Sequence, residues 1–280
     1  FVFQNNTFEL KYESGRNRSP AFRDVDIDHV QLIDNVLSGS SGLNLENSNL
    51  THVLAVENVS SSGESVSQTI KLIGDSTLQN FIVEGISTGS ESNRYAIRTE
   101  CENSLQFGVV FGGAAYGSNS DGGGVRHGCG TNSGSSFGHM VLMNNSPHAF
   151  SPSYDGAAPK LEHIVLYENP LGTDSFNWPN YGSDVATSNP DFICVSYEDM
   201  GLTAFRPAID SPLLNASTSE ENWDGMAADI GPFGGPLGAL WDLDNDGVYA
   251  NPGNIGEEDD SFTDWDCDDL DAAILNGECE

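Results

Sequence analysis

The chain has 280 residues, 38% of them hydrophobic, and 42 acidic against 10 basic residues give it a formal net charge of -32 at pH 7. A surface this negative repels nucleic acid and anionic membranes, which excludes both as expected partners, and it suits multivalent cations and a salty medium. No apolar run approaches the roughly 18–20 residues of a membrane span, so we expect no membrane insertion.

Short apolar and β-branched runs recur through residues 1–215, and each run ends in Ser, Gly or Asn. Examples are HVQLIDNVLSGSSG, LTHVLAVENVSSSGES, LQNFIVEGISTGSES, FGHMVLMNNSPHAF and LEHIVLYENPLG. Their alternation has a period of two, as in LQNFIVEG, which predicts strands rather than helices. The runs recur at irregular intervals of roughly 20–30 residues, as expected when turn loops differ in length.

Runs of this length build either a sandwich or a solenoid. The repeated unit favours the solenoid, in which each coil stacks on the last and shares its core, with Asn forming ladders at the turns. We expect this all-β solenoid over residues 1–238, with long loops at 112–137 and 170–200. Four histidines stand just before an apolar run, which indicates a structural corner rather than a metal cluster: His29, His52, His139 and His163.

A terminal segment, AIDSPLLNASTSEENWDGMAADIGPFGGPLG, occupies residues 208–238. With the recurring runs, it resembles the right-handed parallel β-helix family of secreted bacterial proteins, in which a segment SPxxNxG…DGxxxDIGAxGG finishes the last coil. The matching residues are Asp224–Gly225, Asp229–Ile230–Gly231 and Gly234–Gly235, with Pro232–Phe233 at the Ala–Tyr positions. The resemblance implies a parallel β-helix that is secreted, extracellular or displayed on the cell surface. Because the chain opens in the strand-like FVFQNNTFEL, we expect further coils before Phe1.

Proteins of this fold often act as polysaccharide lyases or hydrolases, so a carbohydrate-active enzyme is an alternative function. The only candidate catalytic residues lie in the predicted Gly/Ser loop: Asp121, Arg126 and His127. The N-T-D and R-I-K motifs of galacturonase-like sites are absent, and an isolated Arg–His pair in such a loop is usually solvated. A catalytic function is therefore the less favoured expectation.

The last 40 residues contain 14 carboxylates and neither Lys nor Arg. The first acidic cluster spells D-x-D-x-D-G and consists of Asp242, Asp244, Asp246 and Gly247. Alternate carboxylates in a tight loop converge on one point, and the Val248 carbonyl adds an oxygen. Hard oxygen ligands in this number suit calcium. Position 12 of a standard EF-hand loop is Gly253 here, so the closing ligand must come from elsewhere.

The second acidic cluster, DCDDLDAAILNGECE, contributes Asp266, Asp268, Asp269, Asp271 and Glu280. Together the two clusters resemble the MopE-type metal-binding repeat of bacterial surface proteins, with departures at Asn276 and Glu278. The resemblance implies that residues 239–280 form a small module that folds around one or two calcium ions.

Five cysteines occur without a CxxC pair, which argues against zinc and iron–sulfur sites. Cys267 and Cys279 flank the second acidic cluster and form the favoured disulfide pair. Cys101 and Cys129 bracket the glycine-rich loop and form a second plausible pair, with Cys194 left over. Disulfides fit an oxidising, extracellular setting, and five reduced cysteines are the alternative.

The leading expectation is an extracellular or cell-surface structural or adhesive β-helix, able to assemble into a fibre and stabilised by calcium at its C-terminal module. Expected partners are other copies of the chain or extracellular polysaccharide. With so few basic residues, direct binding of an acidic polysaccharide is disfavoured electrostatically, which leaves calcium bridging as the alternative route. A carbohydrate-binding adhesin is the other alternative. Aromatic residues near the expected coil ends either stack on sugars or fill the core: Phe150, Tyr154, Phe176, Trp178 and Tyr181.

Overall fold

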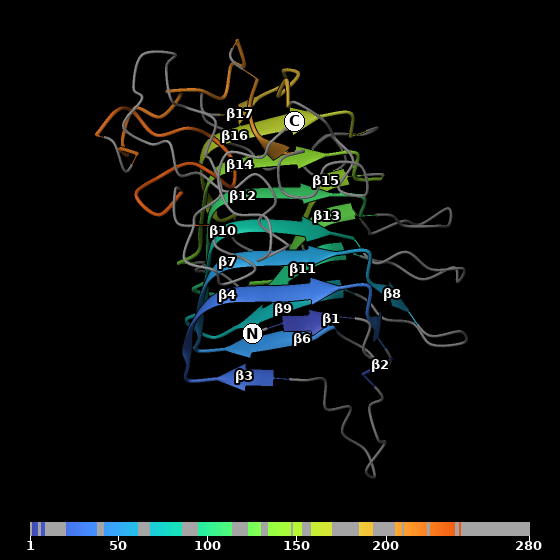
Figure 1. The fold of residues 1–280 in the computed structure, drawn as a ribbon. Helices are drawn as coiled ribbons and strands as arrows, with labels where there is room; N and C mark the ends of the chain where they lie inside the picture. The colour runs from blue at the N-terminus through green and yellow to red at the C-terminus, as the bar shows by residue number, and fades with distance from the viewer. Residues whose placement is uncertain are drawn as a thin grey trace, which may run out of the picture.

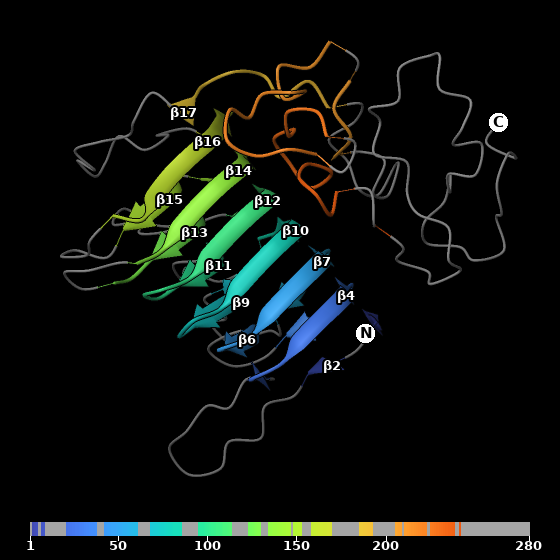
Figure 2. The ribbon, with the colours of Figure 1, turned by 90° about the vertical axis from the view of Figure 1, so that its left-hand side faces the viewer.

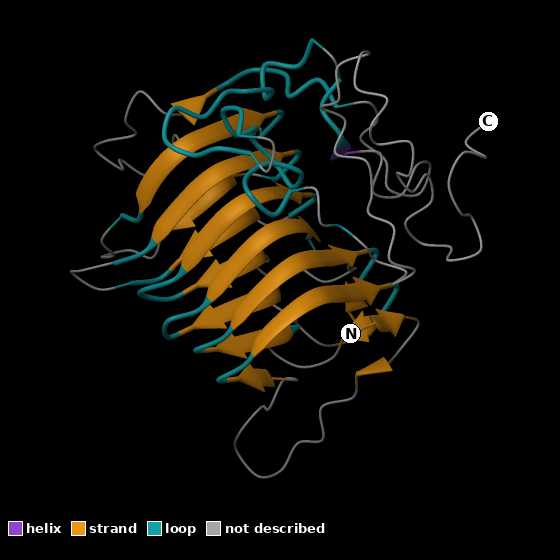
Figure 3. Ribbon diagram, turned by 60° about the vertical axis from the view of Figure 1, so that its left-hand side comes forward, coloured by secondary structure: helices purple, strands orange, loops and turns teal. Residues whose placement is uncertain are grey.

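The protein is described from a computed structural model. The described residues are 2–4, 7–8, 21–37, 42–60, 68–85, 95–113, 123–129, 134–146, 148–152, 158–169, 185–192, 205–208, 210–222, 225–238 and 241. Within these ranges the regular structure is β-strand apart from a short 3-10 turn at Phe205, with no α-helix, and no helix is long and apolar enough to cross a membrane (Figure 3).

Three parallel sheets wind into a β-helix, which confirms the predicted all-β parallel solenoid (Figure 1). The first sheet has the order β1 (Val2–Gln4), β4 (Asp26–Ile33), β7 (Asn49–Val56), β10 (Thr77–Glu84), β12 (Ser104–Phe111), β14 (Ser136–Met143), β16 (Lys160–Tyr167) and β17 (Val185–Ala186). The second has the order β15 (His148–Pro152), β13 (Gly123–His127), β11 (Tyr95–Thr99), β9 (Gln68–Ile73), β6 (Leu43–Glu46) and β3 (Ala21–Arg23). The third contains β2 (Thr7–Phe8), β5 (Val36–Leu37) and β8 (Val59–Ser60).

The long strands β4, β7, β10, β12, β14 and β16 stack in chain order, with in-register partners 23, 28, 27, 32 and 24 residues apart. This irregular spacing agrees with the interval read from the recurring runs. The variation falls between the strands, because each long strand has the same eight-residue length.

The fourth residue of each long strand has a left-handed backbone conformation, with φ between 49° and 56°. We call these six residues the corner row: His29, His52, Asn80, Phe107, His139 and His163. The ladder pairing skips them, because a left-handed residue interrupts the extended strand. The prediction that the four recurring histidines occupy a coil corner is therefore confirmed.

The corner splits each long strand into two parts with different burial. Before it, only the second residue points inward, as Leu50 and Leu78 do. After it, the fifth and seventh residues enter the interior core, whereas the sixth and eighth, such as Leu54 and Val56, join a second apolar cluster on the outer face. Both faces are therefore buried after the corner, as in other covered parallel sheets, and the sequence there is almost continuously apolar.

The second cluster is completed by residues far along the chain. Phe192 and the described parts of residues 205–241, which we call the covering segment, supply its remaining side chains: Phe205, Leu213, Ile230, Phe233 and Trp241. The segment was expected to finish the last coil. Instead, it lies across the outer face of the first sheet, because that face carries an apolar surface that must be removed from water (Figure 2).

Asparagine side chains link neighbouring coils, as predicted for the turns. Asn35 donates through Nδ2 to Asn58 Oδ1 at 3.0 Å, and the Asn145 backbone N–H donates to Asn169 Oδ1 at 2.9 Å. Asn58 and Asn145 are fully buried, and each donates its own Nδ2 to carbonyls of the long strands. The ladder therefore satisfies polar groups that the coil turns bury.

Both predicted loops contain strand residues. The expected loop at 112–137 is wrong at Gly123–His127, which form β13, and β17 lies within 170–200. Val125 enters the core between Ile97 and Phe150. The glycine-rich stretch GGGVRHG gave no strand signal in the sequence. Glycine is needed there because the neighbouring backbone lies very close: a Cβ on Gly124 would lie 2.6 Å from the Ala149 carbonyl oxygen.

Candidate functional site

The corner row is hydrogen-bonded to the covering segment along most of its length. As the segment advances toward the C-terminus, its contacts move back from β16 toward β7, on one side of the stacked strands (Figure 2). The bonds are Thr218 N to His163 Nε2 (3.3 Å), Gly231 N to His139 O (3.0 Å), Asn80 Nδ2 to Pro232 O and Gly234 O (2.9 Å each), and His52 Nε2 to Leu237 O (2.8 Å).

At one end of this row a carboxylate joins two imidazoles. Asp28 Oδ1 lies 2.6 Å from His52 Nδ1, and Asp28 Oδ2 lies 3.2 Å from His29 Nδ1. The His52 side chain is 1% exposed, whereas that of Asp28 is 56% exposed. Burial acts to raise the pKa of Asp28, but its contact with His52 Nδ1, the hydrogen bond from Thr51 and the two nearby imidazoles outweigh this effect and hold the pKa well below its usual range.

At the other end the same residue types are connected differently. Glu162 accepts hydrogen bonds from Lys160 Nζ at 2.8 Å and from Ser219 Oγ at 2.6 Å, and these bonds lower the pKa of Glu162 to about 2. His163 Nε2 faces Thr218, and the His139 ring lies 4.9 Å from the His163 ring. This carboxylate is therefore turned toward an amine and a hydroxyl rather than toward the two imidazoles.

His139 is buried in a neutral state. Ser217 Oγ accepts backbone N–H groups of Ser219 and Glu220 at 3.1 and 2.9 Å, so it donates its own proton to His139 Nε2 at 2.9 Å. The ring stacks on Phe107 with centroids 4.6 Å apart. Burial, with a smaller effect of the neighbouring His163, lowers the pKa of His139 to about 4.

Two of the three candidate catalytic residues, Arg126 and His127, make contacts that hold the fold together. His127 is 1% exposed, and its Nδ1 lies 2.8 Å from Thr99 Oγ1. The Arg126 guanidinium lies 5.1 Å from the centre of the Tyr95 ring and donates to the Tyr95 hydroxyl at 3.1 Å. The expectation of a solvated Arg–His pair is therefore wrong, because β13 places both residues in the second sheet. Asp121 lies outside the described residues.

The second sheet also aligns basic residues that are far apart in the sequence. Register pairs Lys71 with Arg98 and Arg98 with Arg126 on successive strands, and we call these three residues the cation row. Asn44 and Ser151 extend it at its two ends. Buried polar atoms without a hydrogen-bond partner in the described coils occur at three of its five positions: Asn44 Oδ1, Arg98 Nε and Ser151 Oγ.

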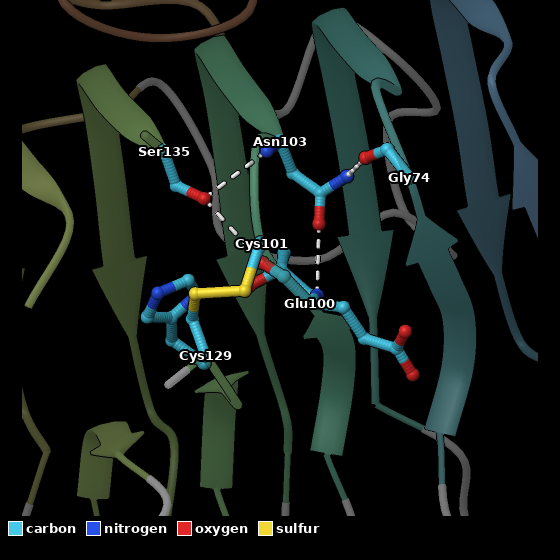
Figure 4. The surroundings of a disulfide bond; sticks show 8 residues. Gly74, Glu100, Cys101, Asn103, Cys129 and Ser135 are labelled. Atoms are coloured by element: carbon cyan, nitrogen blue, oxygen red, sulfur yellow. Dashed lines mark hydrogen bonds between the residues drawn. A yellow bond between two sulfur atoms is a disulfide. The ribbon is translucent and has the colours of Figure 1, made fainter. Parts of the chain in front are cut away.

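A disulfide joins Cys101 to Cys129, which confirms that predicted pair (Figure 4). It links the turn before β12 to the end of β13, 28 residues apart, and in the chain-entropy model such a loop closure contributes about 3–4 kcal/mol. Beside it, Asn103 accepts from Glu100 N at 2.8 Å and donates its backbone N–H to Ser135 Oγ at 3.1 Å. The bridge therefore reinforces a polar ladder between neighbouring coils.

The predicted calcium module lies outside the described residues. This applies to its proposed ligands Asp242, Asp244, Asp246, Val248, Asp266, Asp268, Asp269, Asp271 and Glu280, to Cys194, Cys267 and Cys279, and to Tyr154, Phe176, Trp178 and Tyr181. Trp241, which we assigned to the module, is fully buried and donates to Pro232 O at 2.9 Å. Phe150 is 1% exposed in the interior core, so it fills the core rather than offering a sugar platform.

Sequence reasoning identified the corner histidines but missed the acidic residue before two of them. The signal was present in DIDH and KLEH, where Asp28 precedes His29 and Glu162 precedes His163. It also missed the partners Ser217 and Leu237, which no local pattern connects to the corner row.

Comparison with family models, curated proteins and solved structures gives no match to this chain.

The neutral state of His139 predicts a pH-dependent stability. The unfolded chain binds a proton at this residue near its ordinary pKa of 6.5, but the native chain does so only near 4, so native stability falls as the pH drops from 6.5 to 4. The loss amounts to about 3 kcal/mol. Denaturant unfolding between pH 7.5 and 4.5 measures it.

In the variant His139→Asn most of this pH dependence disappears, and Asn80 shows that asparagine fits the corner conformation. His29→Asn, at the equivalent corner of β4, is the control and keeps the loss that His139 causes. An equal pH dependence in the wild type and His139→Asn would contradict the assignment.

Proposed function

We propose that this chain is an extracellular or cell-surface β-helix with a structural or adhesive role rather than a catalytic one. One observation carries the proposal: the described side chains best suited to catalysis hold the coils together. His127 is buried against Thr99, Arg126 is stacked on Tyr95, and His139 is bonded to Ser217. The polar groups of these three side chains therefore bind other residues of the fold.

Charge and redox chemistry support an extracellular location. A net charge of -32 is tolerated best where abundant ions screen repulsion between carboxylates. The Cys101–Cys129 disulfide persists in oxidising compartments. Stacked parallel coils end in strand edges that pair readily with another copy, which supports self-association into a fibre. The coil is assigned the right-handed winding of nearly all parallel crossovers.

The acidic tail is the proposed calcium module, of the MopE type found on bacterial surface proteins. Its D-x-D-x-D-G and D-C-D-D-x-D spacings provide clustered oxygen ligands, and Cys267 and Cys279 flank the second cluster. Trp241 is packed against Phe233, with ring centroids 6.0 Å apart, so the module begins directly at the covering segment. Bound calcium would neutralise a tail that has no basic residue.

Electron microscopy of the full chain, combined with depolymerisation assays on acidic polysaccharides, tests the structural role. We expect calcium-dependent assemblies and no turnover, since the candidate groups are used in packing. Turnover that is lost when Asp121, Arg126 and His127 are replaced would overturn the proposal in favour of a lyase or hydrolase. A chain that stays monomeric with calcium and attaches to no polysaccharide surface would also overturn it.

Calcium binding is tested by thermal melting in calcium and in EGTA. A ligand that binds only the folded state contributes about 2.7 kcal/mol at a hundredfold excess over Kd, so we expect a higher melting temperature with calcium. The double variant Asp244→Ala/Asp268→Ala should lose the increase. The matched control Asp26→Ala/Asp34→Ala, with both residues exposed on or beside β4, should keep it. The same increase in both double variants would contradict the module.

The cation row favours a more specific adhesive function, the binding of an anionic polysaccharide. Its three basic residues come from a total of ten in the chain, and neighbouring strands lie about 4.8 Å apart. Lys71 is neutralised by Glu100 at 2.9 Å, but Arg98 Nε is buried without a hydrogen-bond partner in the described coils. Arg98 as a whole is partly exposed, so a carboxylate of the polysaccharide would pair with the part of its guanidinium that faces solvent.

Affinity electrophoresis against polygalacturonate in EGTA tests this binding, because EGTA removes any calcium bridge from the tail. We expect retardation that weakens with salt and falls roughly tenfold or more in Arg98→Gln. The control is Arg23→Gln, which replaces an exposed arginine paired with Glu46 and should leave the retardation unchanged. Equal retardation by neutral dextran, or no effect of Arg98→Gln, would exclude the cation row as the binding surface.

A further inference from the structure

The cluster of Asp28, His29 and His52 contains an arrangement that the corner fold alone does not explain. One ligand atom from each residue lies within 4.8 Å of the others. The two imidazole rings are stacked, with centroids 4.7 Å apart, and the Asp28 carboxylate reaches both Nδ1 atoms. His29 and Asp28 come from β4 and His52 from β7, so the cluster joins two coils.

The hydrogen bonds of His52 determine where its proton lies. Its Nε2 is 2.8 Å from the Leu237 carbonyl oxygen, which only accepts, so Nε2 carries the proton. Its Nδ1 lies on the other side of the ring, 2.6 Å from Asp28 Oδ1. His29 Nδ1 lies 3.2 Å from Asp28 Oδ2, so the carboxylate brings both imidazole nitrogens into one group.

The donor set matches a divalent transition metal better than calcium. Two imidazole nitrogens and one carboxylate oxygen suit zinc, whereas calcium prefers oxygen alone. Ligating histidines usually donate their other ring N–H to a carboxylate or backbone carbonyl, as His52 does to Leu237. This second bond fixes the orientation of the ring while leaving Nδ1 as the ligand.

The surroundings of the cluster allow the small adjustment that a metal requires. A tetrahedral zinc ion holds its ligands at about 2.0–2.1 Å and therefore roughly 3.3 Å from one another. The His52 ring is held by its bond to Leu237, whereas the side chains of Asp28 and His29 are 56% and 26% exposed. Asp28 also accepts hydrogen bonds from Thr51 Oγ1 and His29 N, so a bound ion would replace these contacts as the two exposed side chains move toward that geometry. The same exposure gives an ion a path from solvent.

We propose that Asp28, His29 and His52 form a binding site for Zn²⁺ or a similar divalent transition metal, with a fourth position open to water. The bound ion ties β4 to β7 and, through the His52–Leu237 bond, ties both coils to the covering segment. The site differs from the proposed calcium module in position and in ligand chemistry, and it does not depend on the proposed function.

The opposite end of the corner row provides a matched control. There Glu162 precedes His163, and His139 is the neighbouring corner residue, so the residue types are nearly the same. However, Glu162 binds Lys160 and Ser219, and His163 Nε2 accepts from Thr218 N. These bonds turn Glu162 away from the two imidazoles, and among the described residues the group of three ligand atoms within 4.8 Å occurs at Asp28, His29 and His52 rather than at this end.

Isothermal titration of Zn²⁺ into the full chain, with excess calcium present to occupy the acidic tail, tests the site. We expect tight binding of one ion, and Co²⁺ should give the visible absorption of a tetrahedral nitrogen–oxygen site. His29→Asn and Asp28→Asn should each weaken this binding at least about tenfold. His163→Asn should change it by no more than about twofold, because distant sites act independently.

Asparagine is chosen at the corner positions because Asn80 adopts the same conformation, and circular dichroism confirms that each variant folds. Three results would overturn the proposal: no Zn²⁺ binding by the wild type in calcium, unchanged binding in His29→Asn, or an equal loss in His163→Asn.

Discussion

The left-handed residue at the fourth position of every long strand is the constraint on which the rest of this structure depends. It makes the third and fourth side chains both face outward, and it shifts the inward positions from the second residue to the fifth and seventh. L-residues other than glycine adopt this conformation at a cost, which asparagine, aspartate and histidine tolerate best. Phe107 is the exception, and its ring stacks on His139. Because the corner recurs in register, each long strand has two parts. Before the corner, inward and outward side chains alternate between buried and exposed; after it, the side chains on both faces are apolar and buried.

Burial on both faces explains why the covering segment is essential to the fold. The outer residues after the corner, such as Leu54 and Val141, would otherwise expose a continuous apolar surface. Phe233 and Trp241 cover this surface, while the backbone carbonyls of the segment accept hydrogen bonds from the polar corner side chains. The covering segment thus both buries the apolar surface of this sheet face and supplies hydrogen-bond partners for its polar corner side chains. Three of the four corner histidines, His52, His139 and His163, contact the covering segment through a ring nitrogen.

Positive charge is scarce in this chain, and the fold concentrates it. Lys71, Arg98 and Arg126 lie far apart in the sequence, yet the parallel register places them side by side in the second sheet. The carboxylates are divided in a comparable way. Asp28 is committed to two imidazoles, whereas the C-terminal carboxylates have only one another in the sequence. These two arrangements favour different cations, because nitrogen ligands select transition metals and oxygen ligands select calcium.

The sequence alone determined the parallel solenoid and the corner histidines, and it offered Cys101–Cys129 as a plausible pair. The first two follow from repeated local patterns, alternating apolar runs and His before a run, whereas the pair was suggested by cysteines that bracket a glycine-rich stretch. Tertiary structure decided the rest. The strand at Gly123–His127 could not be recognised in the sequence, where its glycines indicated a loop. These glycines are present because the backbone of neighbouring coils leaves no room for a Cβ. The path of the covering segment and the partners Leu237 and Ser217 arise from contacts between residues up to 185 positions apart. No local pattern encodes such a contact, because the coil register that creates it exists only once the chain has wound.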